Sequence, residues 1–305
     1  MSKILFTGAT GVLGRAAVPL LVDAGHDVTG IARSSAGATW LEEIGARPAS
    51  ADLFDHRQLA DALAGIDTVV HFATSIPPLS RMSTRRSWDD NDRLRDVATG
   101  RIVDAALATG VERMIQESVT FAYADGGESW LDEDSPIAPP WDVLDSALAA
   151  EEHVTRFRRE GGTGVVLRLS RLYGPGPVSA EYVAAVTARK MPVVGRGNNY
   201  VSSIHVDDAA TALVAALRAA DGTYNVTDDE PVTSADYTGS LARILEAPEP
   251  RRIPAWMGRL ALGRATGLLT TSQRVSNRRF VETTGWSPTF PSVEVGWRHI
   301  VGSDG

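Results

Sequence analysis

The chain has 305 residues, of which 43% are hydrophobic and 22% charged, and its formal net charge is −8. This composition is typical of a globular protein with one large core or two unequal cores. The diffuse negative charge disfavours nucleic acid and anionic membranes as partners, and the absence of cysteine excludes disulfides, thiolate metal sites and thiol nucleophiles. No leader pattern is found, and no apolar run approaches the roughly 20 residues that span a bilayer. We therefore expect a cytoplasmic protein that acts on a small-molecule substrate and holds no metal.

Short apolar segments alternate with helical segments over residues 1–170. In chain order, the sequence predicts a strand at 3–7, a helix at 14–25, a strand at 27–32, a helix at 37–45, a strand at 67–73, a helix at 88–109, a strand at 111–118, a helix opening at 142 and a strand at 164–170. Such alternation gives parallel strands with right-handed crossovers, so the expected fold class is α/β with a doubly wound parallel sheet. One more strand–helix–strand passage follows at 202–229, and residues 231–305 are mostly helical.

Three glycines stand between the first strand and the first helix, in TGATGVLG at 7–14. In this setting the first glycine permits a tight turn, the second lets the backbone approach a diphosphate, and the third lets the helix pack closely on the sheet. The helix start then offers N–H donors to phosphate groups. A tight turn without a ligand is the alternative. The residues expected to bind a dinucleotide here are Thr7, Gly8, Thr10, Gly11, Val12, Leu13 and Gly14.

The Gly-x-x-Gly-x-x-Gly spacing and several later segments resemble the extended, epimerase/dehydratase-like branch of the short-chain dehydrogenase/reductase family. Those segments are ADLFD (51–55), VVHFAT (69–74), YGPG (173–176), SSIHVDDAA (202–210), YNVTDDEPVT (224–233) and NRRFVETTGWSPTFPSVEVGW (277–297). The resemblance covers almost the whole chain.

The resemblance implies a division of the chain into two parts. Residues 1–170 and 200–224 would form a Rossmann domain that binds the nicotinamide cofactor, and residues 171–199 and 225–305 a smaller, mostly helical substrate-binding lobe. Four further cofactor contacts are implied: Asp52 and Leu53 would flank the adenine, and Ala73 and Thr74 would line the path to the ribose and nicotinamide. A homodimer through the helices at 88–109 and 142–160 is implied as well.

The end of the second strand bears on the choice between NAD and NADP. A site that prefers NAD needs a carboxylate there to hold the ribose 2′-hydroxyl, but this chain has Ala32, Arg33 and Ser34. Because a guanidinium pairs with a 2′-phosphate, we expect NADP(H), bound in part by Arg33 and Ser34. Arg15 is an additional candidate. The alternative is that Arg33 is a solvated loop residue.

Members of this family usually carry Tyr-x-x-x-Lys on the helix that opens at 142. The lysine lowers the pKa of the tyrosine, which then exchanges the proton that accompanies hydride transfer. Aligning SALAAEEHV with the Ser-Lys-x-x-x-Glu segment of the family places Val143 and Ala147 at the two positions, and none of the six tyrosines is followed four residues later by lysine. Val119 stands where the family has a hydroxyl. The sequence therefore predicts that the dyad is missing.

Other polar residues are candidates for the missing proton donor. Tyr123, Thr120 and Ser118 follow or end the fifth strand, near the expected nicotinamide site, and are the candidate catalytic residues. A packing role is the alternative for the ring of Tyr123. His205 is an available acid or base at neutral pH, but the resemblance implies that it ties the two lobes together and caps a helix.

Two further groups of residues have both a binding and a structural interpretation. Arg168, Arg278 and Arg279 either hold an anionic group of the substrate or form structural ion pairs. The tryptophans either line an apolar substrate pocket or pack in the core; those concerned are Trp88, Trp130, Trp141 and Trp256.

Taken together, these patterns predict an NADP(H)-dependent oxidoreductase of the short-chain dehydrogenase/reductase type. Its substrate would be a small organic carbonyl or activated alkene, and its proton donor would be non-standard. Two alternatives stay open: an isomerase, lyase or cyclase on the same fold that carries out no net redox reaction, and a non-catalytic sensor that binds NADP(H).

Overall fold

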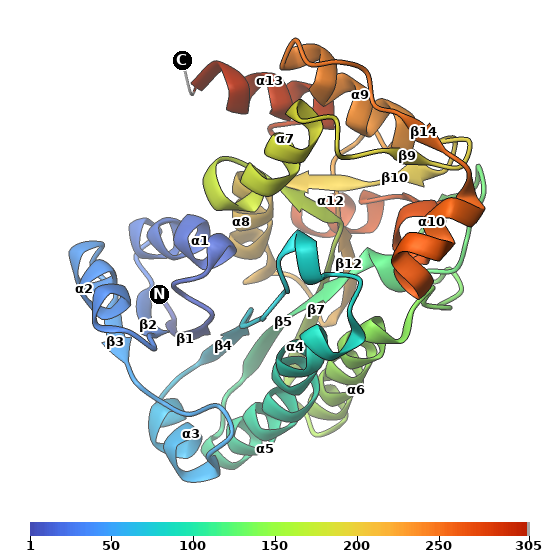
Figure 1. Ribbon diagram of the computed structural model, residues 1–305. Coiled ribbons are helices and arrows are strands. Elements are labelled where there is room, and N and C mark those ends of the chain that lie inside the picture. Colours follow the sequence, from blue (N-terminus) through green and yellow to red (C-terminus); the bar gives the residue numbers. More distant parts are fainter. Residues whose placement is uncertain (304–305) are drawn as a thin grey trace.

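The computed structural model describes residues 1–303 and is built around a sheet of seven strands in the order β12-β7-β5-β4-β1-β2-β3 (Figure 1). All neighbouring strands in this sheet run parallel. The strands are β1 (Lys3–Thr7), β2 (Asp27–Ile31), β3 (Arg47–Ala49), β4 (Thr68–His71), β5 (Arg113–Val119), β7 (Thr163–Leu169) and β12 (Gly222–Val226). The strand order reverses between β1 and β4, and open α/β sheets bind ligands outside the carboxyl ends of the strands at such a reversal. The predicted doubly wound sheet is confirmed.

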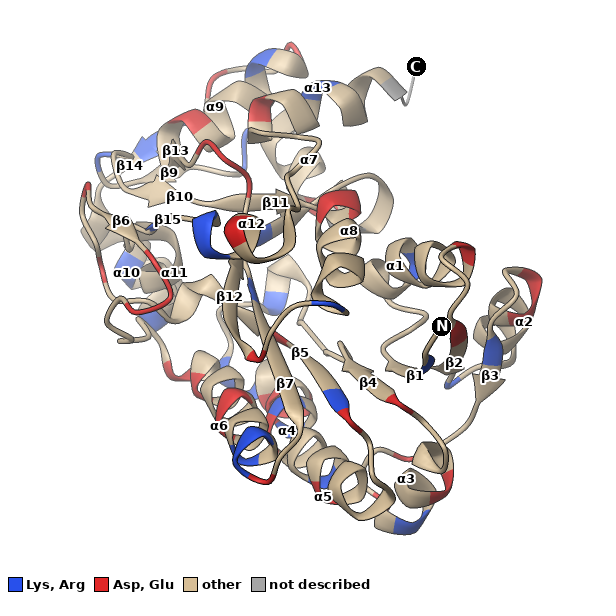
Figure 2. Cartoon of the chain, turned by 180° about the vertical axis from the view of Figure 1, so that it is seen from behind, with Lys and Arg blue, Asp and Glu red and all other residues tan. Residues whose placement is uncertain are grey.

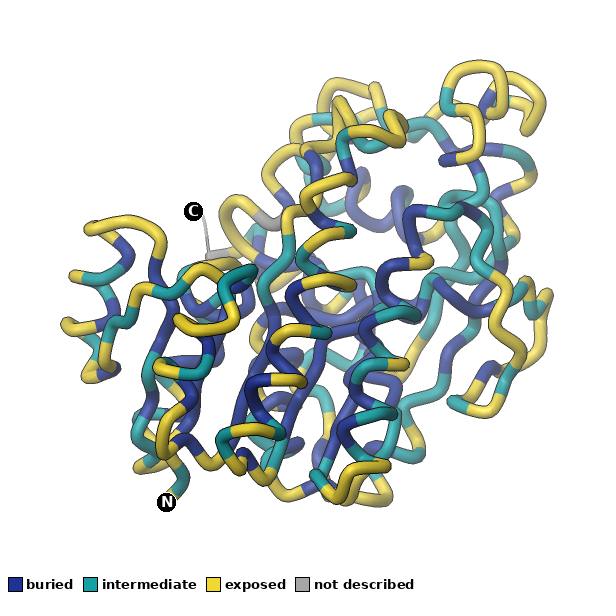
Figure 3. Tube along the Cα trace, turned by 90° about the horizontal axis from the view of Figure 1, so that it is seen from below, coloured by how far each residue is buried: buried dark blue, intermediate teal, exposed yellow. Residues whose placement is uncertain are grey.

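Helices cover both faces of the sheet (Figure 1). One face carries α1 (Val12–Asp23), α2 (Ser35–Glu43) and α8 (Val206–Ala216), and the other carries α3 (His56–Leu63), α5 (Thr99–Thr109) and α6 (Asp145–Arg159). Alternate strand residues supply the two cores: Ile4 and Phe6 belong to one apolar cluster and Leu5 to the other. Figure 3 shows these strands as the most continuously buried part of the chain. Both faces are therefore apolar, as a parallel sheet requires.

The helix predicted at 88–109 is interrupted. It consists of α4 (Asp89–Arg93), a turn of π-helix over Leu94–Ala98, and α5. The π turn carries Arg95 into the interior, where its Nη2 lies 2.6 Å from Oε1 of Glu117 on β5. A π turn inserts one residue and so changes which side chains face the core. This local change accommodates a buried ion pair that a regular helical period does not predict.

The C-terminal part contains helices and short strand pairs, drawn in yellow to red in Figure 1. The pairs are β6 (Trp130–Leu131) with β15 (Arg274–Val275), β8 (Arg171–Tyr173) with β11 (Ser203–His205), β9 (Val193–Val194) with β14 (Arg252–Ile253) and β10 (Tyr200–Val201) with β13 (Val232–Thr233). The helices are α7 (Ala180–Thr187), α9 (Ser234–Ile244), α10 (Ala255–Leu262), α11 (Gly267–Thr270), α12 (Arg278–Thr284) and α13 (Val293–Ser303). Within residues 1–303, no helix has both the length and the apolar character to cross a membrane.

The division of the chain into two parts stays a prediction, and two features of the structure bear on the boundary expected between residues 224 and 225. It falls inside β12, which continues to Val226 in the main sheet. In addition, Phe280 of α12 and the following Trp286 join the apolar cluster that contains Tyr224. Phe280 and Tyr224 meet at a ring distance of 5.6 Å. The chain thus returns to the main sheet near its end, where aromatic side chains cover the edge strand β12.

Candidate functional site

The glycine-rich turn lies between β1 and α1, against the end of β4. Gly8 has a φ of +79°, and a Cβ atom there would lie 2.6 Å from the carbonyl oxygen of Phe72. A Cβ atom at Gly14 would overlap the carbonyl oxygens of Gly8 and Ala9. Only glycine permits these approaches. The turn is therefore held directly against the end of β4, at the point where the strand order reverses.

The first turn of α1 is open to a ligand. Gly11 is its N-cap, and in the described part of the chain no side chain caps this turn and no acidic residue stands in it. Gly11 and Val12 are exposed, Thr10 is half-buried, and Leu13 anchors the helix in the core. An uncapped helix start carries free N–H groups and a partial positive charge, which together bind phosphate. The turn fits the diphosphate of a dinucleotide.

Thr7 supports this turn from beneath. Its hydroxyl is hydrogen-bonded to Nδ1 of His71, and Nε2 of His71 lies 3.2 Å from the carbonyl oxygen of Leu94. Since a carbonyl can only accept, Nε2 carries the proton and Nδ1 accepts from Thr7. Burial lowers the pKa of His71 to about 4, so the ring is neutral. The hydroxyl of Thr7 therefore donates its hydrogen bond to buried His71 and not to a ligand.

Two arginines lie near the end of β2. Arg33 is exposed, and no ion pair or hydrogen bond joins its side chain to another described residue. Arg15 of α1 stacks on the ring of Trp40 in α2 at 4.6 Å, and its Nε donates to the carbonyl of Thr10 at 3.2 Å. Ser34 is the N-cap of α2, where its hydroxyl accepts the N–H of Gly37 at 3.2 Å. The first turn of α2 holds no acidic residue.

The four residues implied by the resemblance follow β3 and β4 at the same edge of the sheet. Asp52 is exposed, and its Oδ1 accepts the N–H of Phe54 at 2.9 Å, which closes a local turn. Leu53 packs in the core below α3, while Ala73 and Thr74 are half-buried directly after β4. The structure therefore brings the expected cofactor residues together at one edge, and their contact with a cofactor stays a prediction.

An apolar wall occupies the place expected for the proton donor. Val143, in the 3-10 turn Asp142–Leu144 that precedes α6, and Ala147, in the first turn of α6, are both fully buried. Val143 belongs to an apolar cluster with partly buried Val119 packed against it. This cluster, called the apolar wall below, consists of Trp88, Trp141, Val143, Leu144 and Ala265, with Met82, Val119, Phe121, Leu262 and Leu268 packed against them.

The four tryptophans separate into two groups. Trp88 and Trp141 are buried in the apolar wall and meet edge to face, with ring centroids 6.2 Å apart. Trp130 is 49% exposed and lies under the guanidinium of Arg274 at 4.2 Å. Trp256 on α10 is 66% exposed. Only the first two therefore contribute to the wall.

Tyr123 and Ser118 belong to a buried polar network behind the sheet edge. The Tyr123 hydroxyl donates to Oδ1 of Asn225 at 2.8 Å and accepts from Nη1 of Arg168 at 2.9 Å. Ser118 donates to Oε1 of Glu151 at 2.6 Å, and Glu151 also accepts two bonds from Arg168, at 2.9 and 2.7 Å. Burial raises the pKa of Tyr123 to about 12. Both hydroxyls are satisfied by protein groups, which favours the structural interpretation of Tyr123.

Thr120 borders a pocket between the end of β5 and the C-terminal lobe. Its Oγ1 lies 3.2 Å from Oγ of Ser170, and it is almost fully buried. The residues around this pocket are Thr120, Phe121, Arg171, Tyr200, Val201, Ser202, Leu268, Thr271 and Gln273. The sequence patterns did not single out Arg171. The signal that could have found it is its place directly after β7, since parallel strands present ligand-binding residues at their carboxyl ends.

The remaining charged and titratable candidates are held in structural contacts. Arg168 is paired with Glu151, Arg278 with Glu282 at 2.6 Å, and Arg279 with Asp134 at 2.5 Å. Figure 2 shows basic and acidic segments side by side at α12. His205 is fully buried, and its Nδ1 accepts the N–H of Asp207 at 3.2 Å, so it caps α8 as the resemblance implies.

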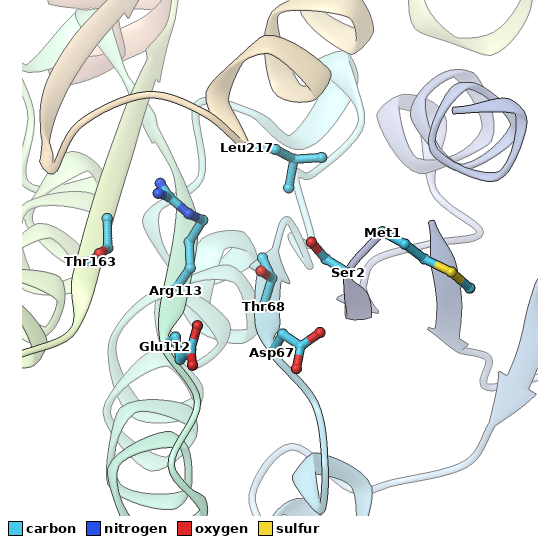
Figure 4. A pocket seen from close by; sticks show the side chains of 8 residues that line it. All are labelled: Met1, Ser2, Asp67, Thr68, Glu112, Arg113, Thr163 and Leu217. Carbon is cyan, nitrogen blue, oxygen red and sulfur yellow. The ribbon is translucent and has the colours of Figure 1, made fainter. Parts of the chain in front are cut away.

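A larger cavity, of about 390 Å³, lies at the opposite edge of the sheet (Figure 4). It is lined by Met1, Ser2, Asp67, Thr68, Glu112, Arg113, Thr163 and Leu217. These residues lie where β1, β4, β5 and β7 begin, and Nη1 of Arg113 donates to the carbonyl of Ala219 at 2.8 Å. Because ligands of open α/β sheets bind outside the carboxyl ends of the strands, this cavity is not part of the candidate site.

Comparison with known proteins agrees with this geometry. The model of the NAD dependent epimerase/dehydratase family matches residues 4–227. A 3-diazoavenalumate denitrifying reductase from a Streptomyces species is 35% identical over 314 residues, which cover 99% of this chain and 100% of that protein. A 2-alkyl-3-oxoalkanoate reductase from Shewanella oneidensis is 29% identical, over 92% of this chain and 74% of that protein.

Among solved structures, the crystal structure of a human epimerase family protein with NADPH superposes with a TM-score of 0.78. It is 21% identical, and the match covers 98% of this chain and 99% of that one. At this identity it shows a shared fold. The relatives named as reductases support an oxidoreductase of the short-chain dehydrogenase/reductase type, and the family supports a nicotinamide cofactor.

Proposed function

The chain belongs to the NAD dependent epimerase/dehydratase family, and from that premise we propose that it is an NADP(H)-dependent reductase that works without a tyrosine proton donor. One observation carries the proposal: a glycine turn shaped for a dinucleotide lies at the same sheet edge as an apolar wall that contains Val143 and Val119. A bound nicotinamide dinucleotide supplies the hydride. The chain's own residues bind and orient the two reactants and exclude water from between them.

The preference for NADP(H) is supported by charge at the end of β2. Arg33 is free to pair with a 2′-phosphate, and Arg15 is held nearby by Trp40. The absence of an acidic residue from the first turn of α2 removes the group that would repel that phosphate. A guanidinium binds a phosphate with charge-assisted hydrogen bonds. The N–H groups at the start of α1 would hold the diphosphate.

The substrate we propose is an aromatic diazo compound, which is reduced with loss of dinitrogen. Support comes from the relative named as a denitrifying reductase, which matches this chain over almost its full length. Replacing a diazonium group by hydrogen breaks one C–N bond, forms one C–H bond and releases N₂. The hydride carries both electrons and the one hydrogen, so the reaction consumes no proton. A site that has Val143 and Ala147 where an acid is expected suits a reaction that consumes no proton.

The apolar wall has two functions in this proposal. Val119, Phe121 and Leu268 are only partly buried on it and offer an apolar surface to an aromatic ring. An apolar surface also holds no water in place, and water competes with hydride for the carbon that loses nitrogen. The wall therefore favours hydride transfer over hydrolysis, although it supplies no group that donates or accepts a proton.

Reduction of a small carbonyl or activated alkene is the second candidate, and Thr120 is the observation that favours it. Such a reduction consumes a proton as well as a hydride. Thr120 borders the pocket and lies beside Ser170, so this pair of hydroxyls could relay a proton from water. The relative named as an oxoalkanoate reductase is consistent with this chemistry.

The test is oxidation of NADPH by the purified chain in the presence of 3-diazonium-4-hydroxybenzoate. It is followed as the loss of absorbance of the reduced nicotinamide at about 340 nm. The proposal predicts one NADPH oxidised for each N₂ released, and slower oxidation of NADH. A Gly14→Val variant, whose side chain fills the glycine turn, controls for reaction outside the site. Oxidation only with ketones or enones would support the second candidate. No oxidation with any of these compounds would overturn the proposal.

A further inference from the structure

Arg171 brings a positive charge into the pocket beside Thr120. It is the first residue of β8, and its backbone N–H donates to the carbonyl of Ser202 at 3.2 Å. All the other residues around the pocket are uncharged. The position of Arg171 is thus fixed by the strand pair β8–β11, and its charge is the only one among the lining residues.

The guanidinium of Arg171 is not neutralised by the protein. Among residues 1–303, no carboxylate forms an ion pair with it, and its Nε is buried without a hydrogen-bond partner. Its neighbours are aromatic rings: the guanidinium carbon lies 5.8 Å from the ring centre of Phe121 and 5.3 Å from that of Tyr237. A partly desolvated charge with an unused donor is costly unless a ligand of opposite charge completes its contacts.

The other arginines considered as anion sites differ from Arg171 in this respect. Arg168, Arg278 and Arg279 each have a carboxylate partner within 2.7 Å. A ligand would have to displace those carboxylates before it could bind. Arg171 offers the same chemistry with no partner to displace.

The surroundings of Arg171 select the kind of anion. One free guanidinium compensates one negative charge, and its two parallel N–H groups match the two oxygens of a carboxylate. Thr120 and Tyr200 add hydroxyl groups to the lining. The pocket is held in shape by Gln273, whose Nε2 donates to the carbonyls of Phe121 and Tyr123 at 3.1 and 2.8 Å. One guanidinium charge and two parallel N–H groups match a singly charged carboxylate better than they match a diphosphate.

The pocket and the apolar wall are continuous. Phe121 and Leu268 belong to both: they line the pocket and pack against the cluster that contains Val143. We propose that Arg171 binds the carboxylate of an aromatic carboxylic acid, with the aromatic part of the molecule against Val119 and Phe121. This inference rests on the proposed function, which gives the reacting group of the substrate. It adds that the other end of the substrate is a carboxylate bound by Arg171.

The experiment is calorimetric titration of the full chain with trans-cinnamate and with cinnamamide, its uncharged analogue of nearly the same shape. We expect the wild-type protein to bind cinnamate at least about tenfold more tightly than cinnamamide. The preference should disappear in Arg171→Gln, survive in part in Arg171→Lys, and stay unchanged in Arg278→Gln, which removes an exposed arginine of α12. Equal affinity of the wild type for both compounds, or no binding of either, would overturn the inference.

Two features keep this test decisive. If Arg171→Gln does not fold, the wild-type protein and Arg171→Lys are compared with the same two probes. A preference for cinnamate that Arg171→Lys retains in full would refute a contact between the guanidinium and both carboxylate oxygens. The titration needs no hydride transfer. Failure to oxidise NADPH together with a retained preference for cinnamate would therefore overturn the proposed function and leave the carboxylate site supported.

Discussion

Val119 at the end of β5 and Val143 in the 3-10 turn before α6 lie in one apolar cluster. These are the positions at which the family resemblance implies a hydroxyl and a tyrosine. Two side chains that can neither donate nor accept a proton thus stand together where a proton donor is expected. They come from different elements and share one packed cluster, which supports the prediction that the dyad is missing.

Restoring the dyad should harm the protein. Val143→Tyr combined with Ala147→Lys places a ring and a charge at two fully buried positions. Overpacking alone costs about 1–3 kcal/mol of the free energy of unfolding, and the buried lysine adds to that cost. We expect a lower urea midpoint and no faster reduction of the diazonium probe. Val143→Phe combined with Ala147→Met, which fills similar space without a proton donor, is the control for packing. A tenfold faster reaction in the double variant would show that a proton donor limits the rate.

Cofactor choice should depend on Arg33. Replacing Arg33 by Asp removes a cation and adds an anion where the 2′-phosphate is expected, so NADPH should bind at least about tenfold more weakly. NADH, which has no such phosphate, should bind with little change. Fluorescence titration of both cofactors measures this, and Arg57→Asp, at an exposed residue of α3, serves as the control. Equal affinity of the wild type for NADH and NADPH would contradict the assignment.

The roles of Tyr123 and Thr120 can be separated by two variants. Tyr123→Phe leaves Oδ1 of Asn225 without its donor and removes one acceptor from Nη1 of Arg168, so it should lower the free energy of unfolding by about 1–3 kcal/mol. Its kcat with the diazonium probe should stay within about twofold of wild type, since no catalytic proton is lost. Thr120→Val should leave that kcat unchanged and slow any reduction of a ketone. A large loss of kcat in Tyr123→Phe at unchanged stability would make Tyr123 catalytic.

Stability should fall in acid because of His71. Burial lowers its pKa from the usual 6.5 to about 4, so between these values the unfolded chain binds a proton that the folded chain excludes. The contribution of His71, about 3 kcal/mol, is complete above its unfolded pKa and is lost as the pH falls through that window. His71→Gln should show a shallower dependence of unfolding free energy on pH, by about one proton. His56→Gln, which changes an exposed histidine, should leave this dependence as in the wild type. A wild-type slope in His71→Gln would refute this account.

Local patterns explain why much of the molecule could be predicted from its sequence. The alternation of strands and helices and the glycines of 7–14 act within short segments, so they predict the sheet and the turn beside β4. The π turn at Leu94–Ala98 depends on Glu117, a partner far away in the sequence, and no helical period reveals it. The same holds for α12, whose return to the sheet depends on aromatic contacts with Tyr224.

Some residues of the candidate site could likewise be predicted from local sequence, whereas the contacts of others depend on distant parts of the chain. Arg33 and the glycine turn follow from position in a single βαβ unit. Arg168 and Arg171 are three residues apart and look alike in the sequence, yet one is paired with Glu151 and the other is unpaired beside aromatic rings. That difference arises from which elements pack against each arginine, α6 against Arg168 and α9 against Arg171, and no pattern along the chain records it.

Isotope tracing tests the central claim most directly. The reaction with 3-diazonium-4-hydroxybenzoate is run once in H₂O with NADPH that carries deuterium at both C4 positions, and once in D₂O with unlabelled NADPH. If hydride replaces the diazonium group without a proton donor, the ring of the product carries one deuterium in the first experiment and none in the second. Deuterium from the solvent in that ring position, or none from the deuterated cofactor, would contradict the account.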